Sequence, residues 1–197
     1  MPSNLFAQGV ALKVIQFRPT GLTGAIMKKS ISGELLYIQD FNEKWRGRVG
    51  FSYASLQPRL DTFPVYAVMD GNSGTTVLPG YEVYHQFNYY LLSFGVDFKM
   101  LHRKKFSIYS GAEILMGGID MEYDSYYETL LEESYSGGST LAGCKFRLGT
   151  EYNLNEHAGI FFEACRNMYY LNKTGFFSHN DIGLGFRYTF IPYDDEK

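Results

Sequence analysis

The stretch SHND carries the residue types best suited to chemistry, because Ser178, His179 and Asp181 stand within four positions of one another. A hydroxyl, an imidazole and a carboxylate are the parts of a hydrolytic set, in which the imidazole takes the proton of the nucleophile and the carboxylate orients the imidazole. The alternative interpretation is a polar loop at the rim of a larger fold. We favour the loop.

The other histidines and the two cysteines form no recognisable site. No zinc-type spacing, phosphate-binding loop or dinucleotide-binding motif is present. We expect His102 and His157 to be solvated in short turns and His85 to lie near the outer rim. Cys144 and Cys165 fall on opposite faces of their predicted strands, and a disulfide requires side chains that point at each other. We therefore favour free cysteines and predict no catalytic residues, no metal site and no cofactor.

The elements that would position these groups are strands. The stretch HNDIGLGFRYTF, residues 179–190, places large apolar side chains at even positions from Ile182 to Phe190. The odd positions hold glycines and the charged Asp181 and Arg187. A period of two indicates a β-strand with two unlike faces. Such a strand suits a soluble sandwich, or a barrel with an apolar exterior and a polar interior.

Eight segments with this alternation follow one another along the chain. They are residues 5–18, 27–40, 45–58, 81–101, 104–122, 139–153, 157–170 and 178–190. Several exceed the ~5–6 residues of a common globular strand, and their length suits a bilayer crossing, which needs ~9–11 residues. No run of ~18 uninterrupted apolar residues exists, which excludes a transmembrane helix.

One face of these segments collects charged side chains. They are Arg46, Arg48, Asp97, Lys99, Glu113, Lys145, Arg147, Glu151, Glu163, Asp181 and Arg187. The six bases and five acids nearly balance. An eight-stranded barrel is just wide enough to be filled by side chains, and buried charges persist only when they are paired. We predict a packed ionic interior without an open pore. The inward face of the first two segments cannot be assigned from the sequence.

The opposite face forms an apolar outward band. It runs through Val49, Phe51, Leu92, Phe94, Val96, Ile108, Ile114, Phe162, Leu184 and Phe186. An inverted barrel, with charges outside and aromatics inside, is the alternative. It would crowd 16 Phe and most of 17 Tyr into one narrow lumen, which steric bulk disfavours.

Short and long connections alternate between the segments. The short ones are FNEK, LHRK and NLNEH, and the long ones contain LDTFPVYAVMDGNSGTTVLPG and YDSYYETLLEESYSGG. This alternation is typical of an outer-membrane barrel, with tight turns on one side and longer loops outside.

The second long loop is the first choice for a contact with another protein, and region 61–80 is the other. Ser125 and Glu128 have the spacing of a capping box, and the TLLEE that follows predicts one or two helical turns. Aromatic and acidic residues surround it, and the candidate contact residues are Tyr123, Tyr126, Tyr127, Glu128 and Tyr135. Tyrosine-rich exposed surfaces suit protein contacts, although Tyr is also common at the membrane interface.

Length and composition favour a single all-β domain. The 197 residues include 21 Gly and only 6 Pro, and the net charge of −3 gives no reason to expect nucleic acid. We expect one domain over residues 1–197, with a lead at 1–4 and a tail at 191–197. The N-terminus MPSNLFAQGV lacks the pattern of a signal peptide. The chain is therefore either not exported or already processed.

The eight-segment meander, the loop alternation and the closing LGFRYTF resemble the small outer-membrane β-barrels of the OmpA membrane-domain, OmpX and opacity-protein group. The Tyr and Gly usage is similar to porin-family barrels of Bacteroidetes-like bacteria. The resemblance covers nearly the whole chain, and its sharpest element is the last strand. In that group the terminal aromatic closes the protein and aids recognition by the assembly machinery, whereas here IPYDDEK follows Phe190.

The resemblance implies an eight-stranded antiparallel transmembrane up-and-down β-barrel in the outer membrane of a Gram-negative bacterium, exported and with its signal peptide removed. With no pore or catalytic set expected, we predict a non-enzymatic, porin-like structural or interaction protein, an accessory subunit of a larger outer-membrane complex. Its partners would be outer-membrane lipid and another outer-membrane protein, with no nucleic acid and no small-molecule substrate.

Three alternatives stay open. One is an outer-membrane lipid-modifying enzyme; lipid A deacylases are similar barrels, but their His-x-Ser-Asn order is absent here. The second is a soluble lipocalin-like ligand-binding barrel. The third is a narrow channel.

Overall fold

The computed structural model describes residues 7–20, 27–59, 62–71, 74–103, 105–127, 130–171 and 175–191. These residues form nine strands: β1 (Gln8–Pro19), β2 (Ser30–Asp40), β3 (Trp45–Leu56), β4 (Thr62–Gly71), β5 (Gly74–Arg103), β6 (Phe106–Tyr127), β7 (Leu130–Asn153), β8 (Ala158–Leu171) and β9 (Gly175–Ile191). Within these ranges there is no helix long and apolar enough to cross a membrane.

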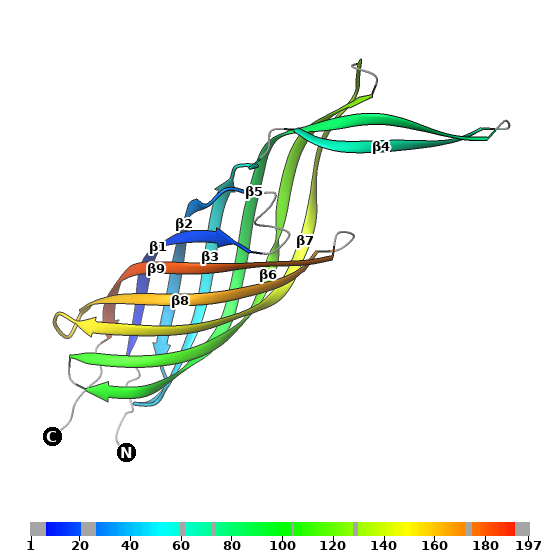
Figure 1. The fold of residues 1–197 in the computed structure, drawn as a ribbon. Coiled ribbons are helices and arrows are strands. Elements are labelled where there is room, and N and C mark those ends of the chain that lie inside the picture. Colours follow the sequence, from blue (N-terminus) through cyan, green and yellow to red (C-terminus); the bar gives the residue numbers. More distant parts are fainter. Residues whose placement is uncertain are drawn as a thin grey trace.

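Eight of the strands close into a barrel. All the pairings are antiparallel, β1 pairs with β9, and β3 pairs directly with β5. β4 therefore lies outside the barrel wall and pairs with the outer part of β5 (Figure 1). Closure leaves no open sheet edge, whose backbone N–H and C=O groups would find no hydrogen-bond partners in lipid. The prediction of an eight-stranded all-antiparallel barrel is confirmed.

The two faces of the wall are strictly unlike. In β3 and β1, buried and exposed residues alternate along almost the whole strand. Of the predicted outward band, nine residues are exposed, among them Ile114 at 66% and Leu184 at 60%, and Ile108 is half-buried. Large apolar side chains thus cover the outside and charged ones fill the inside, so the inverted, lipocalin-like arrangement is wrong.

The two predicted long loops are instead extensions of the strands. β4 and the outer part of β5 form one hairpin, with Thr62 opposite Val83, and β6 and β7 form another, with Tyr123 opposite Tyr135. Figure 1 shows the first hairpin projecting sideways and the second rising above the barrel. Facing aromatic and β-branched side chains stabilise the pairing of these strands. Their composition, taken without the neighbouring strand, is that of a loop.

The predicted helical turns in the second long loop are wrong. The residues from Leu130 onward belong to β7, and Leu130 and Leu131 pair with Tyr127 and Tyr126. Pairing with a neighbouring strand overrides the local helix signal. Glu128 and Thr129 of the proposed cap and helix start lie outside the described residues.

The opposite end of the barrel, here called the turn end, carries the short connections. Asn42 Oδ1 accepts hydrogen bonds from the backbone N–H groups of Lys44 and Trp45, both at 2.8 Å. Asn155 does the same for two backbone N–H groups in the β7–β8 turn. These side-chain caps explain why Asn is placed in tight turns. His102 and His157 are exposed at this end, as predicted.

Candidate functional site

The interior of the barrel is an ionic network. All eleven charged residues assigned to the inward face are buried. Lys13, Glu34 and Asp40, from the two strands whose inward face the sequence left open, are buried with them. Among the described residues the buried charges are thus seven bases and seven acids. The network is neutral, which is the condition under which buried charges are tolerated.

The part of the network nearest the turn end joins five residues. The Arg46 guanidinium contacts Asp40 and Glu151, each at 2.8 Å. Lys99 Nζ lies 2.7 Å from Asp40, and Arg187 Nε lies 2.9 Å from Glu151. Each acid therefore holds at least two bases, so removal of either acid breaks several ion pairs.

The central part is denser. Arg147 pairs with Asp97 at 2.6 Å and with Glu113. Lys145 bridges Glu113 and Glu34, at 2.8 and 2.7 Å. Glu113 and Lys145 are register partners on the adjacent strands β6 and β7, whereas the pair of Lys145 with Glu34 joins β7 to β2 across the lumen.

Glu163 joins this centre to the first strand. It accepts contacts from Lys13 at 2.8 Å, from the Tyr109 hydroxyl at 2.8 Å and from Arg48. Arg48 also lies 3.4 Å from Asp97. Glu163 is fully buried, and the charges of Lys13 and Arg48 converge on it.

Toward the loop end, meaning the end that bears the extensions, the interior becomes apolar. A single cluster fills it: Phe17, Met27, Ala54, Leu56, Phe87, Tyr89, Leu91, Leu115, Ile119, Leu141, Tyr169 and Phe177. The Tyr89 and Tyr169 hydroxyls are hydrogen-bonded to each other across the lumen. An ionic layer below an apolar layer fills the described barrel with side chains, as expected for eight strands.

The sequence-predicted hydrolytic set does not assemble. His179 is not in a rim loop: it lies in β9, points into the barrel and is buried, 3.3 Å from Asp181. Ser178 is the preceding residue of the same strand and points outward, where its hydroxyl contacts Thr20 and Arg166. Successive side chains of a strand take opposite faces, so the nucleophile and the base cannot meet.

The remaining candidate ligands are also apart. Cys144 and Cys165 are free, and Cys165 is buried on the inward face while Cys144 is only half-buried. Among the residues that the structure describes, no group of three or more His, Cys, Asp or Glu side chains could hold a metal ion.

The parts of β4, β5, β6 and β7 that lie beyond the barrel wall, here called the extension, fall within residues 62–86 and 122–136. The extension carries a ladder of aromatic rings. Phe63, Tyr84, Tyr123 and Tyr135 lie on four successive strands, with ring centroids 5.2, 4.9 and 4.8 Å apart. Such pairs contribute ~0.5–1.5 kcal/mol each beyond the area that they bury. The ladder makes the extension a continuous sheet rather than a set of separate loops.

Two more of the predicted contact tyrosines lie at the tip of this sheet. Tyr126 stacks on Tyr81, with ring centroids 4.9 Å apart, and is half-buried, as is Tyr127. Tyr135 remains 39% exposed and Tyr66, on β4, remains 69% exposed. The structure thus brings the described tyrosines of the predicted contact loop into one sheet, and adds β4 to them.

The extension is acidic. In the sequence, residues 62–86 and 122–136, which lie beyond the β3–β5 pairing, contain seven Asp or Glu and no Lys or Arg. A hydrogen bond from Ser134 and a second from His85, 2.9 Å away, hold the pKa of Asp124 below its usual range. Burial and the hydrogen bond that it donates to Glu82 raise the pKa of Tyr84.

An apolar outer wall, a packed ionic lumen and closure by eight antiparallel strands define the chain as having the fold of the small outer-membrane β-barrels. No family model and no curated protein matches the sequence.

Solved outer-membrane barrels match over nearly the whole length. Neisserial surface protein A (NspA) superposes with a TM-score of 0.65 at 12% identity, over 93% of this chain and 97% of that one. A major outer membrane protein from Thermus thermophilus gives 0.54 at 11% identity, over 93% and 99%. The attachment invasion locus protein Ail of Yersinia pestis gives 0.53 at 17% identity, over 94% and 99%. These likenesses establish the fold.

Proposed function

We propose that the chain is a non-enzymatic, single-domain protein of a Gram-negative outer membrane that acts by binding another membrane protein, as an accessory subunit of a larger complex. The observation that carries the proposal is the extension, a four-stranded sheet with an aromatic ladder that stands beyond the barrel wall. A barrel that only crossed the membrane would not need it.

The interior supports a binding role over a transport role. Side chains of a neutral ionic layer and of a mainly apolar layer fill the described lumen. The residues that resemble a hydrolytic set face opposite sides of the wall. With transport and hydrolysis disfavoured, the function that we propose is binding of another protein by the exposed surface.

The extension also indicates the chemistry of the partner. The seven acidic residues of its sequence, with no Lys or Arg among them, favour a partner surface that carries Lys or Arg. Exposed Tyr66 and Tyr135 supply rigid amphipathic rings of the kind enriched at interface centres. β4 pairs on one side only among the described strands, so its other edge is open to a partner strand.

Site-specific photo-crosslinking in the native membrane tests the proposal. A photoreactive residue in place of Tyr66 or Tyr135 should yield one discrete adduct with a second protein. The matched control is Tyr152, which is 48% exposed near the turn end and faces the lipid band, and it should yield no such adduct. Equal adducts at all three positions, or none at Tyr66 and Tyr135, would contradict the proposal.

A further inference from the structure

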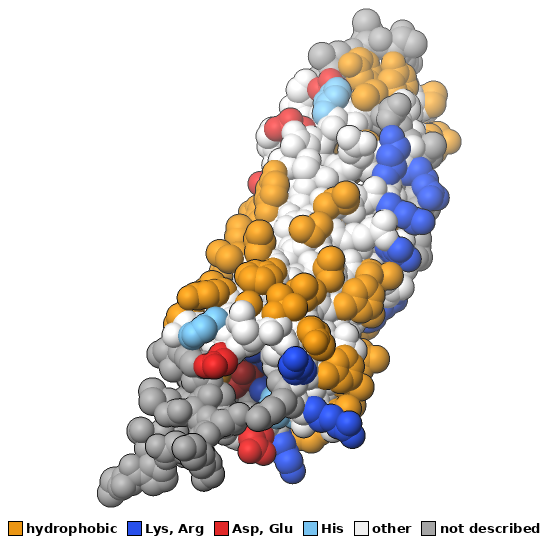
Figure 2. Space-filling model, turned by 90° about the vertical axis from the view of Figure 1, so that its left-hand side faces the viewer, with side chains coloured by type: hydrophobic (Ala, Val, Ile, Leu, Met, Phe, Trp, Pro, Cys, Tyr) orange, Lys and Arg blue, Asp and Glu red, His pale blue; other side chains and the backbone are white. Residues whose placement is uncertain are grey.

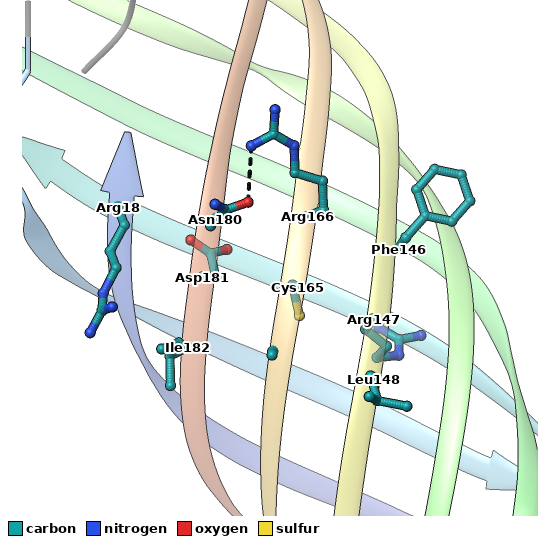
Figure 3. Close-up of a pocket in the computed structure, with 10 residues that line it drawn as sticks. Arg18, Phe146, Arg147, Leu148, Cys165, Arg166, Asn180, Asp181 and Ile182 are labelled. Atoms are coloured by element: carbon teal, nitrogen blue, oxygen red, sulfur yellow. Dashed lines mark hydrogen bonds between the residues drawn. The ribbon is translucent and has the colours of Figure 1, made fainter. Parts of the chain in front are cut away.

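A groove crosses the outer wall of the barrel over β7, β8 and β9. It has a volume of about 510 Å³, within the ~300–1,000 Å³ of ordinary ligand sites. Its floor is the small side chain of Ala164, whose neighbours in register are Leu148 on β7 and Ile182 on β9. A methyl group between two larger side chains leaves a hollow, and Figure 3 shows Leu148 and Ile182 on either side of β8. The hollow opens toward lipid and its lining there is apolar.

Two arginines flank this groove: Arg166 on β8 points toward the loop end, and Arg18 on β1 points back along its own strand toward Gln16 (Figure 3). Arg18, Asn180 and Arg166 are register partners on β1, β9 and β8. Arg166 donates hydrogen bonds to the Thr20 hydroxyl and to Asn180 Oδ1, both at 2.9 Å, as Figure 3 shows for Asn180. It also donates to the Ser178 hydroxyl at 3.2 Å.

No carboxylate among the described residues pairs with either arginine. Every acceptor of Arg166 is a neutral oxygen, and Arg18 Nε donates to the neutral Gln16 at 2.7 Å. The arrangement orients two cations at the boundary of an apolar groove and leaves their charge available.

Further bases continue from these arginines around the barrel. The exposed Lys28, Lys29 and Arg59 lie beside the loop ends of β2 and β3, and these strands follow β8, β9 and β1 in the sheet order. Figure 2 shows Lys and Arg side chains gathered along one side of the upper half of the barrel. The acids of the extension whose side chains the structure describes, Glu82, Glu122 and Asp124, stand on β5 and β6, so an anionic ligand is drawn to this side.

We propose that this wall binds a lipid of the outer leaflet that carries several phosphates, a phosphorylated acyl glycolipid. One phosphate contacts Arg166, a second contacts Arg18, and one acyl chain lies in the groove over Ala164. The inference rests on the proposed placement in an outer membrane. Guanidinium and phosphate form strong charge-assisted hydrogen bonds.

Two features select this occupant. The head group meets the cations at the loop end and the chain runs toward the exposed Phe162 and Leu184 nearer the middle of the wall, which matches the polarity of one leaflet. Five bases over five neighbouring strands exceed the single charge of a phosphodiester, and a lipid with several phosphates matches them better than a glycerophospholipid.

Lipid binding by the isolated full-length barrel in neutral detergent tests this, with native mass spectrometry as the readout. The probes are diphosphoryl lipid A, its monophosphoryl form and phosphatidylglycerol. We expect diphosphoryl lipid A to bind best, and Arg18→Gln/Arg166→Gln to weaken it at least about tenfold. Ala164→Phe fills the groove from outside and should weaken it several-fold. Arg103→Gln, at an exposed position of the turn end, should bind as the parent does.

Three results would overturn the proposal: no bound lipid A, undiminished binding in the double variant, or phosphatidylglycerol bound as tightly as diphosphoryl lipid A. Each variant is first checked for its folded-barrel mobility on a gel, and any that fails is replaced by the corresponding single substitution. The readout needs no protein partner, so its failure is distinct from failure to find the crosslinked subunit.

Discussion

Removal of one charge from the centre of the lumen tests the ionic interior most sharply. In Glu163→Gln the side chain keeps its shape, but Lys13 and Arg48 each lose an ion-pair partner. The seven buried bases then face six acids. Leaving an uncompensated charge in a buried pair costs about 3–5 kcal/mol. We expect the free energy of unfolding to fall by that amount.

The assay is urea-induced unfolding in lipid vesicles. The chain has a single tryptophan, Trp45, which is 45% exposed on the outer wall, so its fluorescence reports transfer from lipid to water. Linear extrapolation gives the free energy of unfolding. Glu122→Gln, at an exposed position of the extension, is the control and should change it by less than about 0.5 kcal/mol.

A second substitution separates charge balance from packing. Lys13→Met added to Glu163→Gln removes the unpaired base and restores neutrality, so we expect the double variant to regain more than half of the loss. A loss below about 1 kcal/mol in Glu163→Gln, or a double variant at least as unstable as the sum of the two single ones, would refute the neutral-network reasoning.

Four further predictions follow from the same structure. Gly111→Ala should destabilise by about 1–3 kcal/mol, because its methyl group would overlap the Asp97 carboxylate, whereas Gly33→Ala meets nothing within 4 Å and should be tolerated in the same urea assay. Phe94→Lys, in the outward band, should cost about 2–4 kcal/mol in vesicles if it lies near the bilayer midplane. The folded-state pKa of Asp124 is lowered, so the stability that its ionised carboxylate gives the extension should be complete above about pH 4 and be lost as the pH falls through the folded-state pKa. The measurement is protection against amide exchange, which should fall in the extension alone. Planar-bilayer recording should show no stepwise conductance, since ionic and apolar layers fill the described lumen.

The wall of the barrel is largely predictable from the sequence because most strands have one apolar and one polar face. The first two strands are not, since both of their faces mix the two kinds. In β2, for example, Glu34 shares the inward face with Leu36, while Gly33 shares the outward face with Leu35. Lys13 and Glu34 can therefore be assigned to the ionic layer only once the fold places Glu163 of β8 and Lys145 of β7 beside them.

The extension and the groove could not be predicted because both depend on residues distant in the sequence. Tyr123 resembles a loop residue until Tyr84 and Tyr135 are placed beside it. The hollow over Ala164 exists only because Leu148 and Ile182 flank it from other strands. Period-two patterns fix the face of a residue, but they carry no information on which strand lies next to it.

Gentle detergent extraction from the native membrane, followed by separation under native conditions and identification of the proteins present, tests the central claim most directly. The account predicts recovery with the outer membrane, at a mass well above that of one barrel in its detergent, together with one defined companion protein. That companion should be lost when the extension is replaced by short turns while the barrel still folds. Recovery of the intact chain as a lone barrel, or without membrane association, would contradict the account.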